Sequence, residues 1–499
     1  MNIKKRKSIK SIIVTLFVLT ILFCANNSQA QVANSSPYSR YGIGDQSNKG
    51  FGQNFAMGGT TIAMQNDSTP MFFINSGNPA SYSNIRLTTA ELGINFNRVQ
   101  LQSEDAKKTI NNASLAYFSL AFPFKKWWGA SVGLLPYSSV GYKVSDRQDI
   151  SNVGIVDFLY EGSGGINQVY FGNGIKPFYG LPGMFMKSKK YRSLLSRSYS
   201  DNTLKSDSAL AADHLRISNK LKCKRNMAAL SLGFNASYMF GNIDNTRRSV
   251  FASNSSSFNT RTGTTTRIAG VYFDYGAQYA YTFDSIRGRD LKDNVKLLLG
   301  ATFSTQADIN AKIDSLSYTY KTSSSGYELG KDTIQNSEGS KGKIVFPLSF
   351  GFGFGIKKGD KWLIAADYAV QNWSSYKAFN KSQGLKNSMR VSLGAQYVPN
   401  SKANGKGSYA QRLNYRIGAH YAQTSLELKN TPLTEVGISL GLGFPVGRSF
   451  LLQSFSMVNM GIEVGQRGTT TNGLIKEQFI KATVGFTLND RWFVKPKFD

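Results

Sequence analysis

Cysteine and histidine are scarce in this 499-residue chain, which holds two of each. Cys24 lies in an N-terminal leader, so the mature chain keeps only Cys223 and an intramolecular disulfide is excluded. His214 and His420 lie in distant segments, and without clustered histidines or cysteines no metal site is expected. The glycine-containing stretches "EGSKGK" and "GFGFGIKKG" lack the spacing of phosphate-binding and dinucleotide-binding loops. We therefore expect no enzymatic activity, no catalytic residue and no cofactor.

Long apolar runs are also absent after the N-terminus, so the mature chain is expected to contain no transmembrane helix. The basic cluster around Lys4–Lys7 precedes the apolar stretch "SIIVTLFVLTILFCA", and "SQA" offers small residues at a cleavage position. Residues 1–30 are predicted to be a secretory signal peptide cut after Ala30. Lipidation at Cys24 is the less favoured alternative, because the large Phe23 precedes it.

Proline is rare, with 12 residues, whereas the chain has 48 glycines, 33 phenylalanines and 25 tyrosines. Aromatic residues suit pleated sheets, so this composition favours β-structure. In "FPLSFGFGFGIKKGDKW", Phe350, Phe352 and Phe354 share one strand face and the intervening glycines share the other. This pattern is typical of a wall with lipid outside and a crowded interior. The phenylalanines are expected to face lipid, with the glycines leaving space inside.

Alternating segments of about ten residues separated by turns are typical of a transmembrane β-barrel. Short and long connections alternate along the chain, which predicts periplasmic termini and polar outer loops at 241–267 and 321–343. The fold class expected is all-β, a 14-stranded antiparallel transmembrane β-barrel in the outer membrane of a Gram-negative bacterium. The fourteen predicted strands begin near residues 89, 113, 127, 167, 227, 268, 295, 346, 362, 389, 413, 434, 454 and 478.

The region between the leader and the first strand is rich in Gly, Ser and Asn but contains apolar stretches such as "FAMGGTTIAM" and "MFFINSGNPASYS". These stretches are too apolar for a solvated tail. Residues 31–85 are therefore predicted to be an N-terminal hatch that fills the lumen, and residues 86–499 the barrel. His420 shares its strand face with Arg416 and Asn414, so it is expected to point into the lumen and bond to the hatch.

The segment "AMGGTTIAMQNDSTPMFFINSGNPASYS" resembles the hatch of the FadL-type (OMPP1/FadL/TodX-like) outer-membrane transporters of long-chain fatty acids and other hydrophobic compounds. "GLLPYSSVGY", "GSGGINQVYFG" and "NDRWFVKPKFD" further resemble a Bacteroidota branch of that family. The resemblance implies a plugged barrel of fourteen strands that passes hydrophobic molecules. It implies a hatch motif at Gly58, Gly59, Asp67, Asn78, Pro79 and Ala80.

Pro136 interrupts the third predicted strand. Because proline cannot donate to a strand ladder, it marks a bulge or a break in the wall. In the resembled family a kink of the third strand makes a lateral opening towards the membrane, and we expect the same at Pro136. A simple bulge is the alternative.

Positive charge is in large excess: the sequence has 59 basic and 30 acidic residues, and without the five basic residues of the leader the net charge is +24. A secreted chain meets lipid phosphates and acidic proteins rather than nucleic acid, so no nucleic-acid partner is expected. An insertion at 178–226 carries eleven basic residues and three acidic ones. It is predicted to be periplasmic and to dock acidic partners of a membrane complex, unless it is only a tolerated, solvated insertion. The residues chosen for docking are Lys187, Lys189, Lys190, Arg192, Lys222, Lys224 and Arg225.

Two functions compete at this point. The first is passive uptake of a hydrophobic small molecule, with movement of the hatch and lateral exit near Pro136. The second is a structural role as a barrel subunit of an outer-membrane protein assembly or secretion complex. An apolar lumenal pocket would favour uptake, and a packed lumen would favour the structural role.

Overall fold

The computed structural model describes residues 36–65, 73–151, 153–181, 226–251, 257–283, 295–323, 325–400, 409–449 and 454–490, together with positions 184, 186, 223, 224 and 492. The predicted signal peptide lies outside these residues. Within them, no helix has the length and apolar character needed to cross a bilayer.

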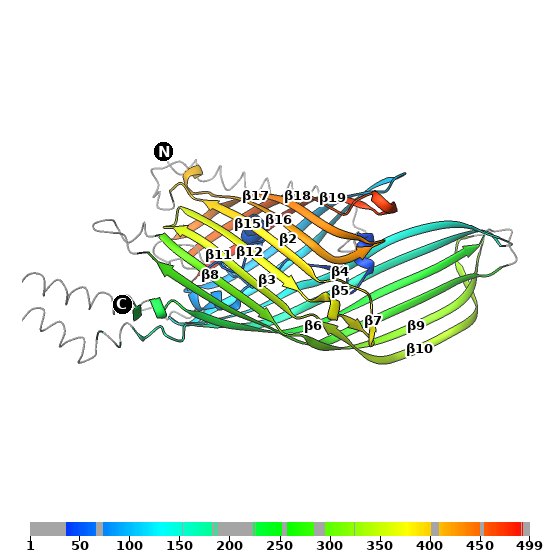
Figure 1. Ribbon diagram of the computed structural model, residues 1–499, viewed down its shortest axis with the longest axis horizontal. Helices are drawn as coiled ribbons and strands as arrows, with labels where there is room; N and C mark the ends of the chain where they lie inside the picture. The colour runs from blue at the N-terminus through cyan, green and yellow to red at the C-terminus, as the bar shows by residue number, and fades with distance from the viewer. Residues whose placement is uncertain are drawn as a thin grey trace, which may run out of the picture.

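The described residues form a closed antiparallel barrel (Figure 1). Strand β19 pairs along its full length with β2, so the ring closes between the two ends of the sequence. Each spanning strand alternates between exposed and buried residues, as the sequence pattern predicted. The spanning strands, in ring order, are β2 (Thr88–Gln102), β3 (Lys107–Lys125), β4 (Trp128–Ile150), β5 (Gly154–Ile175), β6 (Ser231–Phe251), β7 (Asn259–Thr282), β8 (Val295–Ser304), β11 (Ser349–Lys358), β12 (Trp362–Gln371), β15 (Ser388–Tyr397), β16 (Asn414–Leu428), β17 (Thr431–Ser449), β18 (Ser454–Arg467) and β19 (Lys476–Asp490).

Two of these strands continue past the ring after short interruptions. β9 (Ala307–Thr322) follows β8 and stays paired with β7, and β10 (Glu328–Phe346) precedes β11. β9 and β10 pair with each other as a long hairpin. The barrel therefore has fourteen spanning strands, which confirms the predicted fold class, and all fourteen predicted segments are found in it.

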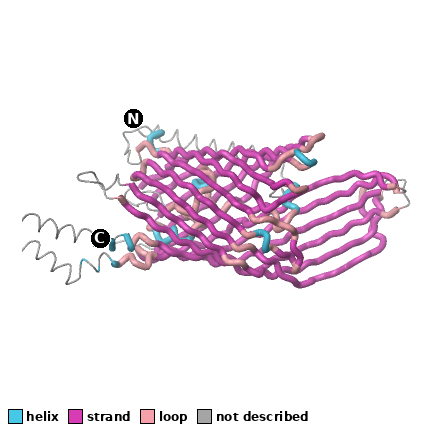
Figure 2. Tube along the Cα trace, in the orientation of Figure 1, coloured by secondary structure: helices cyan, strands magenta, loops and turns pink. Residues whose placement is uncertain are grey.

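The predicted long outer loops at 241–267 and 321–343 are mostly strand instead of loop. Strands β4 to β7, β9 and β10 extend as a curved six-stranded sheet beyond the other strands, at one end of the barrel (Figure 2). The prediction ended these strands too early because their outer parts are rich in Thr, Ser and charged residues. Such residues remove the apolar alternation but keep the ladder hydrogen bonds.

The outer surface of the barrel is apolar at the level of β11. Phe350, Phe352 and Phe354 are 46%, 62% and 47% exposed, whereas the glycines between them are buried. The phenylalanines thus point out of the barrel, as predicted, and form part of its lipid-facing surface.

The N-terminal segment lies inside the ring and supplies much of the lumenal core. Its elements are η1 (Pro37–Arg40), β1 (Asp45–Gln46), α2 (Gly52–Phe55) and η2 (Pro79–Asn84). Phe51, Met57, Ile74 and Tyr82 are almost fully buried, and Phe51 stacks on Tyr117 of β3 with 4.1 Å between the ring centroids. This segment is called the hatch below.

Glycines on the inner face of the wall let the hatch backbone approach the strands directly. A Cβ atom on Gly418 of β16 would overlap the backbone of Met57 and Gly58, and one on Gly353 of β11 would overlap Ala63. The hatch therefore fills the space that Gly351 and Gly353 of β11 leave inside the barrel.

Candidate functional site: the split wall and its hatch

The barrel wall is split between β3 and β4 towards its outer end. Their pairing runs from Lys125–Trp128 to Phe118–Leu134 and stops there. β3 continues along β2, and β4 continues along β5, so the two strands diverge from this point. Beyond this point, each strand has one edge that pairs with no other wall strand among the described residues.

Pro136 lies two residues beyond the last pair between β3 and β4. On the other side of β4, Pro136 pairs with Asn167 and Ser138 with Ile166, so Tyr137 is an extra residue, a β-bulge. The Tyr137 side chain points into the lumen and stacks on Phe346, with 5.4 Å between the ring centroids. A bulge and the end of strand pairing thus coincide at this proline, because it cannot donate a backbone hydrogen bond.

The hatch covers part of the open edge of β4. Strand β1 pairs with it antiparallel, with Asp45 opposite Ser139 and Gln46 opposite Ser138. On either side of β1, the Ser47 amide donates to the Tyr137 carbonyl (2.9 Å) and the Gly141 amide donates to Ser39 Oγ (3.0 Å). The hatch therefore replaces β3 as the neighbour of β4 over the first residues of the split.

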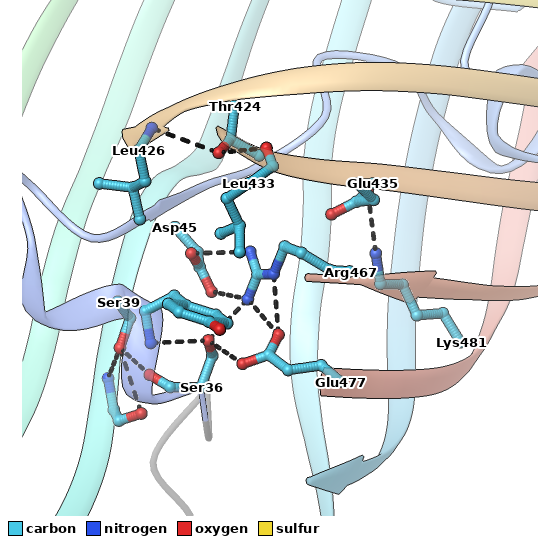
Figure 3. Close-up of polar contacts among 12 residues, drawn as sticks. Ser36, Ser39, Asp45, Thr424, Leu426, Leu433, Glu435, Arg467, Glu477 and Lys481 are labelled. Carbon is cyan, nitrogen blue, oxygen red and sulfur yellow. Dashed lines mark hydrogen bonds and ion pairs between the residues drawn. The ribbon is translucent and has the colours of Figure 1, made fainter. Parts of the chain in front are cut away.

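An arginine on β18 holds this covering segment in place (Figure 3). The Arg467 guanidinium donates to both Asp45 carboxylate oxygens at 2.9 Å and to Glu477 of β19 at 2.8 Å. It also donates to Ser36 Oγ (2.6 Å), and Ser36 in turn donates to Glu477 (2.5 Å). One cation flanked by two carboxylates and a hydroxyl forms a charge-assisted network, which we call the latch.

The glycine pair of the hatch motif forms a turn against β15, β16 and β17. Gly58 and Gly59 have φ angles of +71° and +86°, which L-residues with a side chain rarely adopt. The Gly58 amide donates to Ser439 Oγ (2.9 Å) and its carbonyl accepts from Arg390 (3.5 Å). The two glycines thus place backbone polar groups directly on the wall.

The Asn-Pro-Ala part of the motif lies on another part of the wall, at β7 and β8. Asn78 caps η2 by accepting from the Ala80 amide (3.1 Å), and Pro79 fills the first helical position. The Asn78 amide group donates to the carbonyls of Ile62 (2.8 Å), Ala277 (3.2 Å) and Ala301 (3.4 Å). Asn78 therefore connects two parts of the hatch with each other and connects both to strands β7 and β8. Asp67 lies outside the described residues.

Carboxylates on the inner wall hold the hatch by its backbone and by one lysine. Asp367 of β12 accepts from the amides of Thr61 (2.5 Å) and Ile62 (2.8 Å), and Glu91 of β2 accepts from Ile74 (3.2 Å). These anchors face different parts of the ring, so the hatch is fixed from several sides.

Lys49 of the hatch forms an ion pair with Asp274 of β7 at 2.8 Å. Burial lowers the pKa of Lys49, but the Asp274 carboxylate outweighs that effect and the pKa is raised above its usual value. Together with Gln168 and Asn235, the pair lines a small cavity that leaves room for about one water molecule.

His420 points into the lumen, as predicted, but its partners belong to the wall and not to the hatch. Its Nε2 atom is 3.2 Å from Glu435 Oε1, and its Nδ1 atom is 3.5 Å from Glu463 Oε2. Lys481 approaches Glu463 to 3.4 Å. This group therefore braces β16 to β19 from within. Nowhere in the described part of the chain does a cluster of His, Cys, Asp and Glu suited to a metal ion occur.

Most of the basic insertion, including His214, lies outside the described residues. Of the predicted docking residues only Lys224 is described, and it is half-buried. Docking through the insertion stays a prediction. The sequence reasoning missed the latch residues Asp45 and Arg467 and the anchor Asp367. The only sequence signal for these residues is a single charged residue at the end or on the inner face of a strand. In the sequence, such a residue cannot be distinguished from a charged residue exposed to solvent.

A closed, lipid-facing antiparallel barrel with an internal hatch defines an outer-membrane β-barrel protein. Its fold is that of the FadL-type channels. A crystal structure of the Pseudomonas putida toluene transporter TodX has a TM-score of 0.51 and 13% identity, covering 90% of this chain and all of that one. A second TodX structure has a TM-score of 0.50 and 14% identity, covering 91% of this chain and all of that one. A Pseudomonas aeruginosa FadL homologue has a TM-score of 0.48 and 10% identity, covering 90% and 98%.

The family is shown by sequence. The chain matches the BamG family model over residues 8–182 and 222–499, and it belongs to the BamG family. The gap in this match, 183–221, falls within the basic insertion. The sequence matches none of the curated proteins.

Proposed function

We propose that this protein is a sealed barrel subunit of an outer-membrane protein assembly or secretion complex. The observation that carries the proposal is the filling of the lumen by the hatch. Wall glycines such as Gly353 and Gly418 admit the hatch backbone to direct contact, and Asp367, Glu91 and Arg467 bond to it from different strands.

Polar and charged contacts of this kind are costly to break inside a protein, because each released group must be resolvated or left unpaired. A hatch held in this way suits a permanent stopper better than a moving gate. The cavity beside Lys49 has room for about one water molecule, which is too small for a hydrophobic solute. The BamG family match over most of the chain is compatible with this role.

Native electrophoresis with mass spectrometry, on tagged protein gently extracted from its own membrane, tests the proposal. Migration in a large complex with a constant set of partners is the expected result. Migration as a single barrel with bound lipid or fatty acid would contradict it and favour uptake.

Passive uptake of a hydrophobic small molecule is the second candidate, and the split at Pro136 favours it. In this function the open edge of β4 beside Pro136 is the lateral exit, and β1 must leave that edge for a solute to pass. The fold shared with TodX, a toluene transporter, is compatible with the idea.

A disulfide between Cys substitutions at Gln46 and Ser138 tests this second function. These residues are directly paired across β1 and β4, at a Cα separation that suits a disulfide. In a Cys223→Ser background, oxidation would lock β1 onto β4. If the barrel transports, uptake of a labelled fatty acid falls on oxidation and returns on reduction. Equal uptake in both states would rule out exit beneath β1.

A further inference from the structure

The six-stranded sheet beyond the rim ends in two edges, one on β4 and one on β10. Beyond Leu134, β4 pairs with no described strand on its β3 side except β1. β10 pairs with β9 on one side, and on its other side only Ile344 and Val345 pair, with the short strand β13 (Lys377–Ala378). Such edges present unpaired backbone groups to which another chain can add a strand.

The β10 edge carries the features that prevent such pairing. Its ladder with β9 has register shifts after Gly330, Thr333 and Ser337, and Gly339 has a φ angle of +64°. Bulges twist an edge away from an incoming strand, and charged side chains add a cost of burial. The charged residues along this edge are Glu328, Lys331, Asp332, Glu338, Lys341 and Lys343.

The β4 edge lacks such irregularities. From Ser138 to Ile150 it pairs with β5 without a register shift. Its two basic residues are engaged with β5: Lys143 lies 2.7 Å from Glu161, and Arg147 forms a two-fold contact with Asp157 at 2.6 and 2.9 Å. Lys143 and Arg147 are thus held over the sheet, and of the two acidic residues in this stretch, Asp146 accepts from Gln148 (2.7 Å) and Asp149 lies at its end.

The hatch already uses this edge as a template. Tyr137, Ser139 and Gly141 turn their backbone groups towards the hatch. Because backbone direction alternates along an antiparallel strand, the N–H and C=O groups of Lys143, Ser145, Arg147 and Asp149 point the same way. They continue the row beyond the last hatch contact, at Ser39.

From this we infer that β4, from Lys143 to Asp149, receives an extended strand of a partner protein at the outer surface, end to end with the hatch strand β1. The inference rests on the proposed function and names the surface through which one partner is held. Backbone pairing supplies the affinity, and Tyr142 and Val144, on the inner face, contact alternate side chains of the added strand.

The test compares proline variants at the two edges. Ser145→Pro removes an N–H group that points away from β5, so it breaks no hydrogen bond between β4 and β5. Lys341→Pro is the matched control on β10. The Lys343 carbonyl points away from β9, towards Phe379, and the backbone groups of Lys341, two residues earlier, point the same way. Both variants are expected to fold, which resistance of the barrel to SDS before heating verifies. Ser145→Pro should lower the partner recovered per barrel about tenfold, and Lys341→Pro should leave it unchanged.

Hydrogen exchange on the intact complex provides the second readout. The amides of Lys143, Ser145 and Arg147 should exchange at least about tenfold more slowly in the complex than in the isolated barrel, whereas those of Val144 and Asp146 are protected in both. A complex that survives Ser145→Pro with these amides unprotected would overturn this inference and leave the proposed function standing. A barrel that migrates alone would overturn both. A complex consisting of two copies of this chain would overturn the assignment of a different partner.

Discussion

Arg467 on β18 and Asp45 on β1 form a bidentate ion pair, with both guanidinium-to-carboxylate distances at 2.9 Å. Asp45 is also the residue that pairs with Ser139 at the open edge of β4. The pair therefore ties the strand that covers the open edge of β4 to the wall on the β3 side of the split. It links the position of the hatch to the closure of the wall.

Arg467→Ala should destabilise the latch strongly, because it removes the guanidinium from between the Asp45 and Glu477 carboxylates. Loss of one partner from such a buried network costs about 3–5 kcal/mol. The temperature at which the SDS-resistant barrel unfolds should fall, and protease should gain access to the segment around Ser39. Arg147→Ala is the control, because the Arg147–Asp157 pair is largely exposed and worth only about 0.2–1 kcal/mol. Equal unfolding temperatures for the two variants would contradict the latch.

Gly418→Ala should prevent the hatch from seating. The added Cβ atom overlaps the backbone of Met57 and Gly58, which cannot rotate away as a side chain could. Overpacking of this kind costs about 1–3 kcal/mol or more. Gly355→Ala is the matched control, since its Cβ atom would meet its nearest neighbour, the Ile364 carbonyl, at 3.3 Å and Leu298 at 3.5 Å. Ion conductance of purified barrels in planar bilayers should rise for Gly418→Ala only; unchanged conductance would argue against a seated hatch.

Phe352→Arg should impair folding of the barrel into lipid. Phe352 is 62% exposed on the outer face of β11, and a cation on the lipid face near the bilayer midplane costs about 2–4 kcal/mol. Tyr327→Arg tests the same chemistry outside the membrane, because Tyr327 is 73% exposed at the β9–β10 turn. The folding yield in lipid vesicles can be measured from the change in electrophoretic mobility on heating. It should be reduced for Phe352→Arg and not for Tyr327→Arg. Equal folding yields would place Phe352 outside the lipid band.

Asn78→Asp should be more damaging than Asn78→Ala. The carboxylate keeps the acceptor for the Ala80 amide but turns its second oxygen towards the carbonyls of Ile62 and Ala277, which it cannot bond. A buried charge facing acceptors is costlier than a lost side chain, whose hydrogen bonds are worth about 0.5–1.5 kcal/mol each. Thermal unfolding of the two variants measures the difference, and the reverse order would mean that Asn78 acts mainly as a cap for η2.

Much of the barrel could be predicted from the sequence, because lipid outside and a packed lumen inside force a two-residue period on each spanning strand. Phe352 and Gly353 display this period directly. The outer sheet could not be predicted in the same way, since residues such as Thr262 and Ser317 pair as strands without any apolar face. The latch was also hidden: Asp45 and Arg467 are separated by most of the chain, and only the fold brings them together.

The order in which the molecule is built follows from where the ring closes. The final seam joins β2 to β19, strands from opposite ends of the sequence, so the circle cannot be completed until the last strand is present. The hatch precedes β2 and is contacted by strands around the ring, from Asp274 of β7 to Arg467 of β18. A segment gripped on so many sides cannot thread in afterwards through a finished wall. The hatch must therefore already lie against the open sheet when β19 pairs with β2, so that closure of the barrel encloses it.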